Sequence, residues 1–273
     1  MSDAPPDSRV RISTEPGPKR TLKQTIVALT WPVVVGQVLA NIVPLIDLLM
    51  LRKHGTLTLA AVGYAAQFLM LTQATLIALG AACVAMMARA IGARDPDLAR
   101  RSFAANLWLA LGVTGTTLLI TWVFPEQLLH LLAVDESVIH LAVPYLRLTL
   151  TAAPLMAISL TFESAFRAAR DTFRPMLIVS LIACIKVFAN MVLLSGLFGF
   201  PDLGLTGAAY STLISQLAGC VLFIGASRAH GHSTVRLSLR DLWVPSATLR
   251  EAFALAWPAV AERFAMNAAT LFY

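Results

Sequence analysis

Charged side chains are scarce in this sequence. Asp, Glu, Lys and Arg make up only 13% of its 273 residues, whereas 58% are apolar and the mean hydropathy is +0.73. A soluble domain carries about 25% charged residues, so this composition excludes a soluble globular protein and indicates a membrane protein. The apolar stretches are long and lack a two-residue alternation. They therefore predict membrane-spanning helices rather than the short alternating strands of a barrel.

Cysteine is also rare, and common enzyme motifs are missing. Cys83, Cys184 and Cys220 lie in apolar runs without the spacing of metal ligands, so we expect no disulfide and no metal site. His230 and His232 are close in sequence but lack further ligands. The sequence contains no phosphate-binding loop, no HExxH and no nucleophile with an evident base. We therefore expect neither enzymatic activity nor a bound cofactor.

Seven apolar runs are long enough to span a bilayer as helices, which requires about 20 residues each. The predicted helices are 26–50, 59–88, 102–124, 142–166, 175–198, 205–226 and 252–273.

The basic residues predict the orientation of these helices. With the N-terminus in the cytoplasm, the inner segments hold 16 of the 21 Lys and Arg residues, and the outer segments hold only Arg52 and Lys53. This asymmetry satisfies the positive-inside rule, so it explains the net charge of +6 without a nucleic-acid partner. The inner residues are Arg9, Arg11, Lys19, Arg20, Lys23, Arg89, Arg94, Arg100, Arg101, Arg167, Arg170, Arg174, Arg228, Arg236, Arg240 and Arg250.

The last apolar run repeats the first. ALTWPVVVGQVLANIVPLIDL from residue 28 and ALAWPAVAERFAMNAATLFY from residue 254 share a Trp-Pro pair and an Asn in register. Six spans separate the two starts, so both copies enter the membrane from the same side. Parallel repeats of this kind are common in transporters. We expect a cytoplasmic disordered tail (1–24), a six-helix lobe (25–226), a cytoplasmic inter-lobe loop (227–250) and the first helix of a truncated second lobe (251–273).

Five segments in order carry a resemblance to a known family. They are IDLLMLRKHGTLTLAAVG from residue 46, ARAIGARDPDLARR from 88, YLRLT from 145, FRAARDTFRPM from 166 and GFPDLGLTGAAYST from 199. Together they resemble the first half of multidrug and toxic compound extrusion (MATE) transporters, within the MOP flippase superfamily. The resemblance covers residues 20–273 and implies an all-α polytopic membrane protein: one six-helix lobe of a twelve-helix, two-lobe fold, plus the seventh helix.

The resemblance also implies a function. A MATE-like protein exports drugs or organic cations across the inner membrane by alternating access, coupled to H⁺ or Na⁺, and is expected to be a multi-pass monomer when complete. Its partners would be the lipid bilayer and a small cationic or amphipathic substrate. Two alternatives stay open: a lipid-linked oligosaccharide flippase of the same superfamily, and a non-transporting truncated fragment.

Asp47 is the first candidate for the coupling site. A carboxylate inside a bilayer costs at least ~2.5–3.5 kcal/mol and marks a functional site by default, and burial favours its neutral form. Pro44 lies one turn earlier and can kink the helix, so we expect Asp47 to bind the coupling cation and to bend the helix on protonation. The alternative is a carboxylate at the outer interface, paired with Arg52 or Lys53.

Lys186 is the second candidate for cation or proton coupling. It lies well inside its predicted span, one turn before Asn190, where the MATE family usually has a neutral polar residue. A buried ammonium requires a carboxylate partner, and we expect Asp47 first, with Glu163 and Glu262 as the other candidates. A Lys186–Asp47 pair could act as the coupling switch. Alternatively, Lys186 extends toward the cytoplasmic interface.

Four polar residues are expected to line the substrate cavity. Gln37 and Asn41 share a helix face, Asn190 lies in the fifth span, and Glu262 corresponds to an acid that lines the cavity in the MATE family. Interhelical hydrogen bonding is the alternative role for Gln37 and Asn41, and a neutralising pair with Arg263 near the inner interface is the alternative for Glu262. A stripe of small residues, expected to pack helices closely, is formed by Gly207, Ser211, Ser215 and Gly219.

Overall fold

The computed structural model describes residues 22–132, 134–195, 203–229, 235 and 243–271. In this part the chain is helical, as expected for long apolar runs whose backbone groups must be satisfied within the segment. The predicted tail (1–24) lies almost entirely outside the described residues, and so does half of the predicted inter-lobe loop (227–250). The elements are α1 (Leu22–Leu51), η1 (Arg52–His54), α2 (Thr56–Gly92), α3 (Pro96–Val123), α4 (Pro125–His130), α5 (Glu136–Thr151), α6 (Ala153–Ala168), α7 (Phe173–Ser195), α8 (Gly204–Ala229) and α9 (Ser246–Leu271).

Six helical segments are long and apolar enough to cross a membrane, counted over the described residues. They are Thr30–His54, Thr56–Gly92, Pro96–Val123, Glu136–Ala168, Phe173–Leu194 and Gly204–Ala229. α9 forms a helix near the predicted 252–273 but is not among these six. With 37 residues, α2 is about 55 Å long at 1.5 Å per residue, which exceeds the ~30 Å hydrocarbon core. It must therefore tilt or extend beyond the hydrocarbon.

The fourth predicted span, 142–166, differs from the structure because it is two helices. α5 ends at Thr151, α6 begins at Ala153, and the Ala152 N–H bonds to the Thr149 carbonyl at 3.1 Å instead of continuing the α-helical ladder. Pro154 explains the break, because it has no N–H to offer to the carbonyl one turn earlier. By contrast, α1 continues without a break through Pro32 and Pro44.

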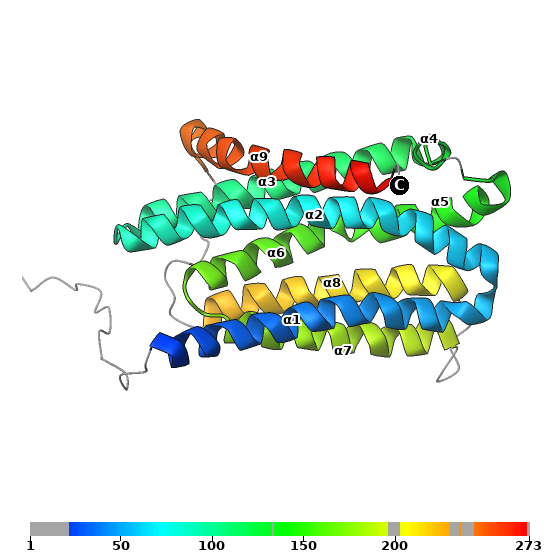
Figure 1. Ribbon diagram of the computed structural model, residues 1–273, viewed down its shortest axis with the longest axis horizontal. Coiled ribbons are helices and arrows are strands. Elements are labelled where there is room, and N and C mark those ends of the chain that lie inside the picture. The colour runs from blue at the N-terminus through cyan, green and yellow to red at the C-terminus, as the bar shows by residue number, and fades with distance from the viewer. Residues whose placement is uncertain (1–21, 133, 196–202, 230–234, 236–242, 272–273) are drawn as a thin grey trace, which may run out of the picture.

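The helices pack into two groups on either side of α2 and α6. α1 packs along α7, and α7 along α8, so these three helices lie side by side along one edge of the molecule (Figure 1). α9 packs against α2 and α3 at the opposite edge (Figure 1). The small-residue stripe of α8 faces α7: a Cβ on Gly207 would lie 2.7 Å from the backbone oxygen of Leu193. Small side chains are what allow this close approach.

Two connections on the predicted cytoplasmic side have the same structure. The triplets Ala-Arg-Asp at 93–95 and 169–171 link α2 to α3 and α6 to α7. In each triplet the three N–H groups bond in turn to carbonyls four, three and five residues earlier. Both arginines have left-handed backbones, with φ of 58° at Arg94 and 62° at Arg170, a conformation that favours glycine.

Candidate functional site

The centre of the site is an ion pair between α1 and α7. The Lys186 Nζ atom lies 2.6 Å from Asp47 Oδ2, and the two side chains are 17% and 18% exposed. Of the three carboxylates expected as partners of Lys186, the structure therefore places Asp47 beside it. Glu163 is instead paired with Arg167, one turn away on α6.

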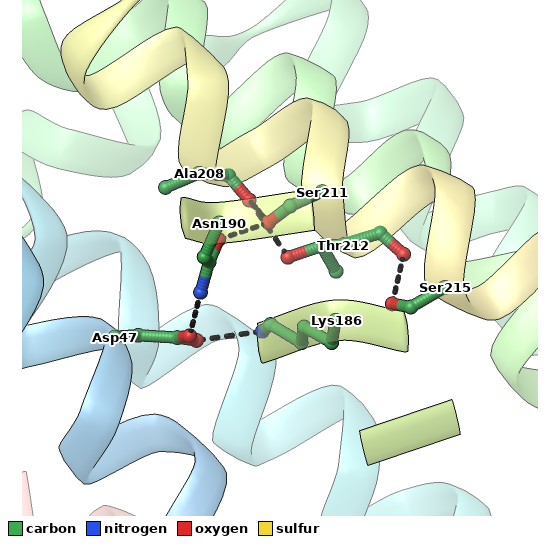
Figure 2. Close-up of polar contacts among 7 residues, drawn as sticks. All are labelled: Asp47, Lys186, Asn190, Ala208, Ser211, Thr212 and Ser215. Carbon is green, nitrogen blue, oxygen red and sulfur yellow. Dashed lines mark hydrogen bonds and ion pairs between the residues drawn. The ribbon is translucent and has the colours of Figure 1, made fainter. Parts of the chain in front are cut away.

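Asn190 connects this pair to α8. Its Nδ2 donates to the second oxygen of Asp47, and its Oδ1 accepts a hydrogen bond from the Ser211 hydroxyl (Figure 2). Asn190 and Ser211 are both fully buried. Four side chains from α1, α7 and α8 thus form one connected chain: Lys186, Asp47, Asn190 and Ser211. We refer to these four residues as the polar network.

The polar network occupies both oxygens of the carboxylate. One oxygen of Asp47 contacts the ammonium of Lys186 and the other accepts from the amide of Asn190 (Figure 2). Ser211 Oγ also lies 2.8 Å from the carbonyl oxygen of Ala208 on its own helix. Since a hydroxyl has a single proton, the two acceptors of Ser211 compete for it.

The helices that carry the network also share a buried apolar cluster. Its helical members come from α1, α2, α4, α5, α6, α7 and α8 and include Tyr145, Leu146, Leu194 and Ala208. The charge of Asp47 acts on the hydroxyl of Tyr145 on α5. Electrostatic interactions strengthen where apolar packing lowers the effective dielectric constant.

The two amides predicted on α1 lie outside the polar network. Gln37 and Asn41 are exposed, and Asn41 Nδ2 donates to the Gln37 backbone oxygen at 2.7 Å, within the same helix. Glu262 is also separate from the network: it is exposed on α9, at the opposite edge of the molecule from α1 and α7. Their cavity role remains a prediction.

Sequence reasoning missed two residues of this region. The spacing of small residues predicts a packing role for Ser211, although its hydroxyl also joins α8 to Asn190. Tyr145 stands out in the sequence only as part of the YLRLT segment. A serine within a small-residue stripe has the same sequence signature whether or not it bonds across the interface, so no local pattern could have separated these roles. Among the described residues, no group of three or more His, Cys, Asp or Glu side chains could hold a metal ion.

The sequence of this chain matches a known protein family. The MatE family model matches residues 32–193, which is more than half of the chain. This chain belongs to the MatE family. The matched range contains α2, α3, α5 and α6 in full, and three of the four residues of the polar network: Asp47, Lys186 and Asn190.

Named relatives agree with this assignment. A probable multidrug resistance protein NorM from Thermotoga maritima is 25% identical over 257 residues, covering 92% of this chain and 54% of the relative. Another probable NorM, from Aromatoleum aromaticum, is 30% identical over 187 residues, covering 67% and 40%. An FAD transporter from Shewanella oneidensis is 27% identical over 178 residues, covering 65% and 39%. The chain thus spans about half the length of the relatives it matches, or less.

Solved structures share the fold. A crystal structure of MATE in the bent conformation superimposes with a TM-score of 0.82 at 25% identity, covering 92% of this chain and 55% of that one. A MOP superfamily transporter from Pyrococcus furiosus, described as having a binding pocket of reverse polarity, gives 0.79 at 24% identity, with 92% and 54% covered. The predicted all-α MATE-like fold is therefore confirmed.

Proposed function

We propose that this chain provides the ion-coupling lobe of a cation-coupled antiporter, which exports drugs or organic cations across the inner membrane by alternating access. Membership of the MatE family supports the transporter class. The observation that carries the coupling role is the polar network, in which a carboxylate on α1 holds an ammonium on α7 and an amide that reaches α8. The proposal includes no covalent chemistry and no resident cofactor.

The network supplies a physical basis for coupling. Binding a proton or cation at Asp47 cancels the charge that holds Lys186, and it changes which of the hydrogen bonds to Asn190 can form. Because these contacts join three helices, the loaded and unloaded lobes prefer different arrangements of α1 against α7 and α8. An ion shifts a conformational equilibrium only by its difference in affinity for the two states, and here that difference arises at one carboxylate.

The predicted orientation and substrate complete the proposal. The N-terminus is cytoplasmic, because the basic residues concentrate on that side, and the complete transporter acts as a monomer. Cationic or amphipathic compounds are the first substrate class to test. A flavin nucleotide belongs in the same panel, because one relative is named as an FAD transporter.

The test uses the full-length protein that contains this chain, reconstituted in proteoliposomes. Efflux of a fluorescent substrate is recorded after a pH jump or a sodium jump. We expect Asp47→Asn to reduce gradient-driven efflux at least about tenfold, since removing an essential ionisable group removes coupling. The matched control is Asp135→Asn, which removes an exposed carboxylate outside the described spans and is expected to leave efflux unchanged. Wild-type rates in Asp47→Asn would refute the coupling role.

A further inference from the structure

We infer that Lys186 determines ion selectivity: its ammonium occupies the cation position at Asp47, so the site excludes Na⁺ and the coupling ion is H⁺. This inference rests on the proposed function and names the ion that the function leaves open. It starts from the 2.6 Å contact between Lys186 Nζ and Asp47 Oδ2.

The first step concerns space and charge. A sodium ion at Asp47 would have to lie beside the fixed positive charge of Lys186 or displace it from the carboxylate. Two like charges a few ångströms apart repel strongly where water is largely excluded, and both side chains here are less than one-fifth exposed. The ammonium therefore acts as a tethered competitor that is always present.

The second step concerns ligands. Hard cations bind several oxygen atoms, and an ammonium offers none. The described hydrogen bonds link the Asp47 carboxylate to Asn190 and, through it, to the Ser211 hydroxyl, and the Asn190 amide oxygen already accepts from Ser211. Replacing the ammonium by an amide would remove the repulsion and add an oxygen to this set.

The third step explains why a proton can still bind. A proton attaches to one oxygen of Asp47 without needing a coordination shell or the volume that Lys186 fills. Asp47 becomes a neutral acid and Lys186 keeps its own proton, so the step consumes one H⁺ from solution and moves no other proton. The acid can then donate to the Asn190 oxygen if the amide rotates, while Asn190 donates to Ser211 and Ser211 to the carbonyl of Ala208 at 2.8 Å.

The ionisable surroundings of Asp47 are few in the described part of the chain. Lys186 on α7 forms the ion pair and Tyr145 on α5 interacts with the charge of Asp47. Arg52 and Lys53, on η1 after α1, are exposed, and α8 contributes the neutral Ser211. The only cation that this part of the structure places on the carboxylate is therefore the lysine.

The test measures sodium binding directly, without requiring transport. Purified full-length protein is heated in NaCl or choline chloride at equal ionic strength, and ²²Na⁺ binding is measured at equilibrium. We expect no sodium-specific rise in Tm for the wild type. Lys186→Gln should gain a sodium-specific rise in Tm and bind ²²Na⁺ on the order of 100-fold more tightly than the wild type. The double variant Asp47→Asn/Lys186→Gln should lose the tighter sodium binding. The control variant Arg147→Gln, which removes a cation from another helix, should bind sodium no more tightly than the wild type.

The outcomes separate the inference from the proposed function. Sodium binding by the wild type that Asp47→Asn abolishes would overturn the inference, and so would a folded Lys186→Gln that binds no more sodium than the wild type. Lys186→Asn is the second variant if Lys186→Gln does not fold. In proteoliposomes the wild type should respond to a pH jump and not to a sodium jump. Efflux driven by neither gradient would refute the proposed function, while the sodium-binding result would still decide the role of Lys186.

Discussion

Removing either partner of the Asp47–Lys186 pair leaves the other charge without its counter-ion between α1 and α7. The informative experiment is a double-mutant cycle with Asp47→Asn, Lys186→Gln and the combined variant. Both substitutions keep a polar side chain of similar size, so the cycle reports mainly on charge. We expect each single variant to be less stable than the combined variant.

The magnitude follows from the geometry. At 2.6 Å and an effective dielectric constant of about 20, two unit charges attract by roughly 6 kcal/mol. Desolvation of both groups offsets part of this attraction, so breaking a buried pair destabilises by about 3–5 kcal/mol, whereas replacing both partners is far less costly. Since each single variant costs about 3–5 kcal/mol and the combined variant costs less than either, we expect a coupling energy of at least about 3 kcal/mol. Exposed pairs give only about 0.2–1 kcal/mol.

The assay is equilibrium unfolding of the full-length protein in mixed micelles with increasing dodecyl sulfate, added as its choline salt, and is followed by circular dichroism. Sodium is replaced by choline throughout, so that ion binding does not stabilise Lys186→Gln. A coupling energy below about 0.5 kcal/mol near neutral pH would be that of a surface pair. It would refute the buried ion pair and the reasoning built on it.

Three further predictions concern packing and backbone, and each is measured by the same unfolding assay. Gly207→Ala should destabilise the protein by about 1–3 kcal/mol, because the added Cβ would lie 2.7 Å from the α7 backbone. The control Gly225→Ala, on the same helix, places its Cβ in open space and should be neutral or stabilising by up to ~1 kcal/mol. Equal effects of the two substitutions would contradict the close contact at Gly207. Arg94→Gly and Arg170→Gly should each stabilise the protein by about 0.5–1 kcal/mol, because glycine adopts a positive φ with less strain than arginine. A loss of stability would show that contacts of the arginine side chains outweigh this backbone strain. Asn190→Leu should destabilise by about 1–3 kcal/mol, because it removes a partner from the buried Ser211 hydroxyl and another from the largely buried Asp47 carboxylate. An unchanged midpoint would exclude Asn190 from the network.

Much of the fold could be predicted from composition and spacing. Lipid cannot satisfy backbone groups, so each long apolar run had to be helical. Within the described parts of the chain, six segments are long and apolar enough to span the membrane. The break at Ala152 was missed even though Pro154 is visible in the sequence. A proline does not by itself decide whether a membrane helix bends or stops, as the unbroken α1 with its two prolines demonstrates.

The candidate site, too, could be predicted only in part from the sequence. Asp47 and Lys186 stand out in the sequence because an ionisable group inside an apolar run is expensive whatever it contacts. Gln37 and Asn41 stand out as polar amides in an apolar run, yet they lie outside the network. The bond between Ser211 and Asn190 had no sequence signal, because it depends on how closely α7 and α8 approach.

The sequence by itself determined that this protein is a helical membrane protein and which charges are costly to bury, and its basic residues predict an orientation. These properties follow from transfer of each segment between water and lipid, and that free energy depends on the residues of the segment alone. Only the tertiary structure decided that the ammonium of Lys186 meets Asp47 rather than Glu163 or Glu262, and that Asn190 and Ser211 extend the contact to α8. Asn190 and Asp47 are 143 positions apart, so their contact arises from the packing of helices and not from any local pattern.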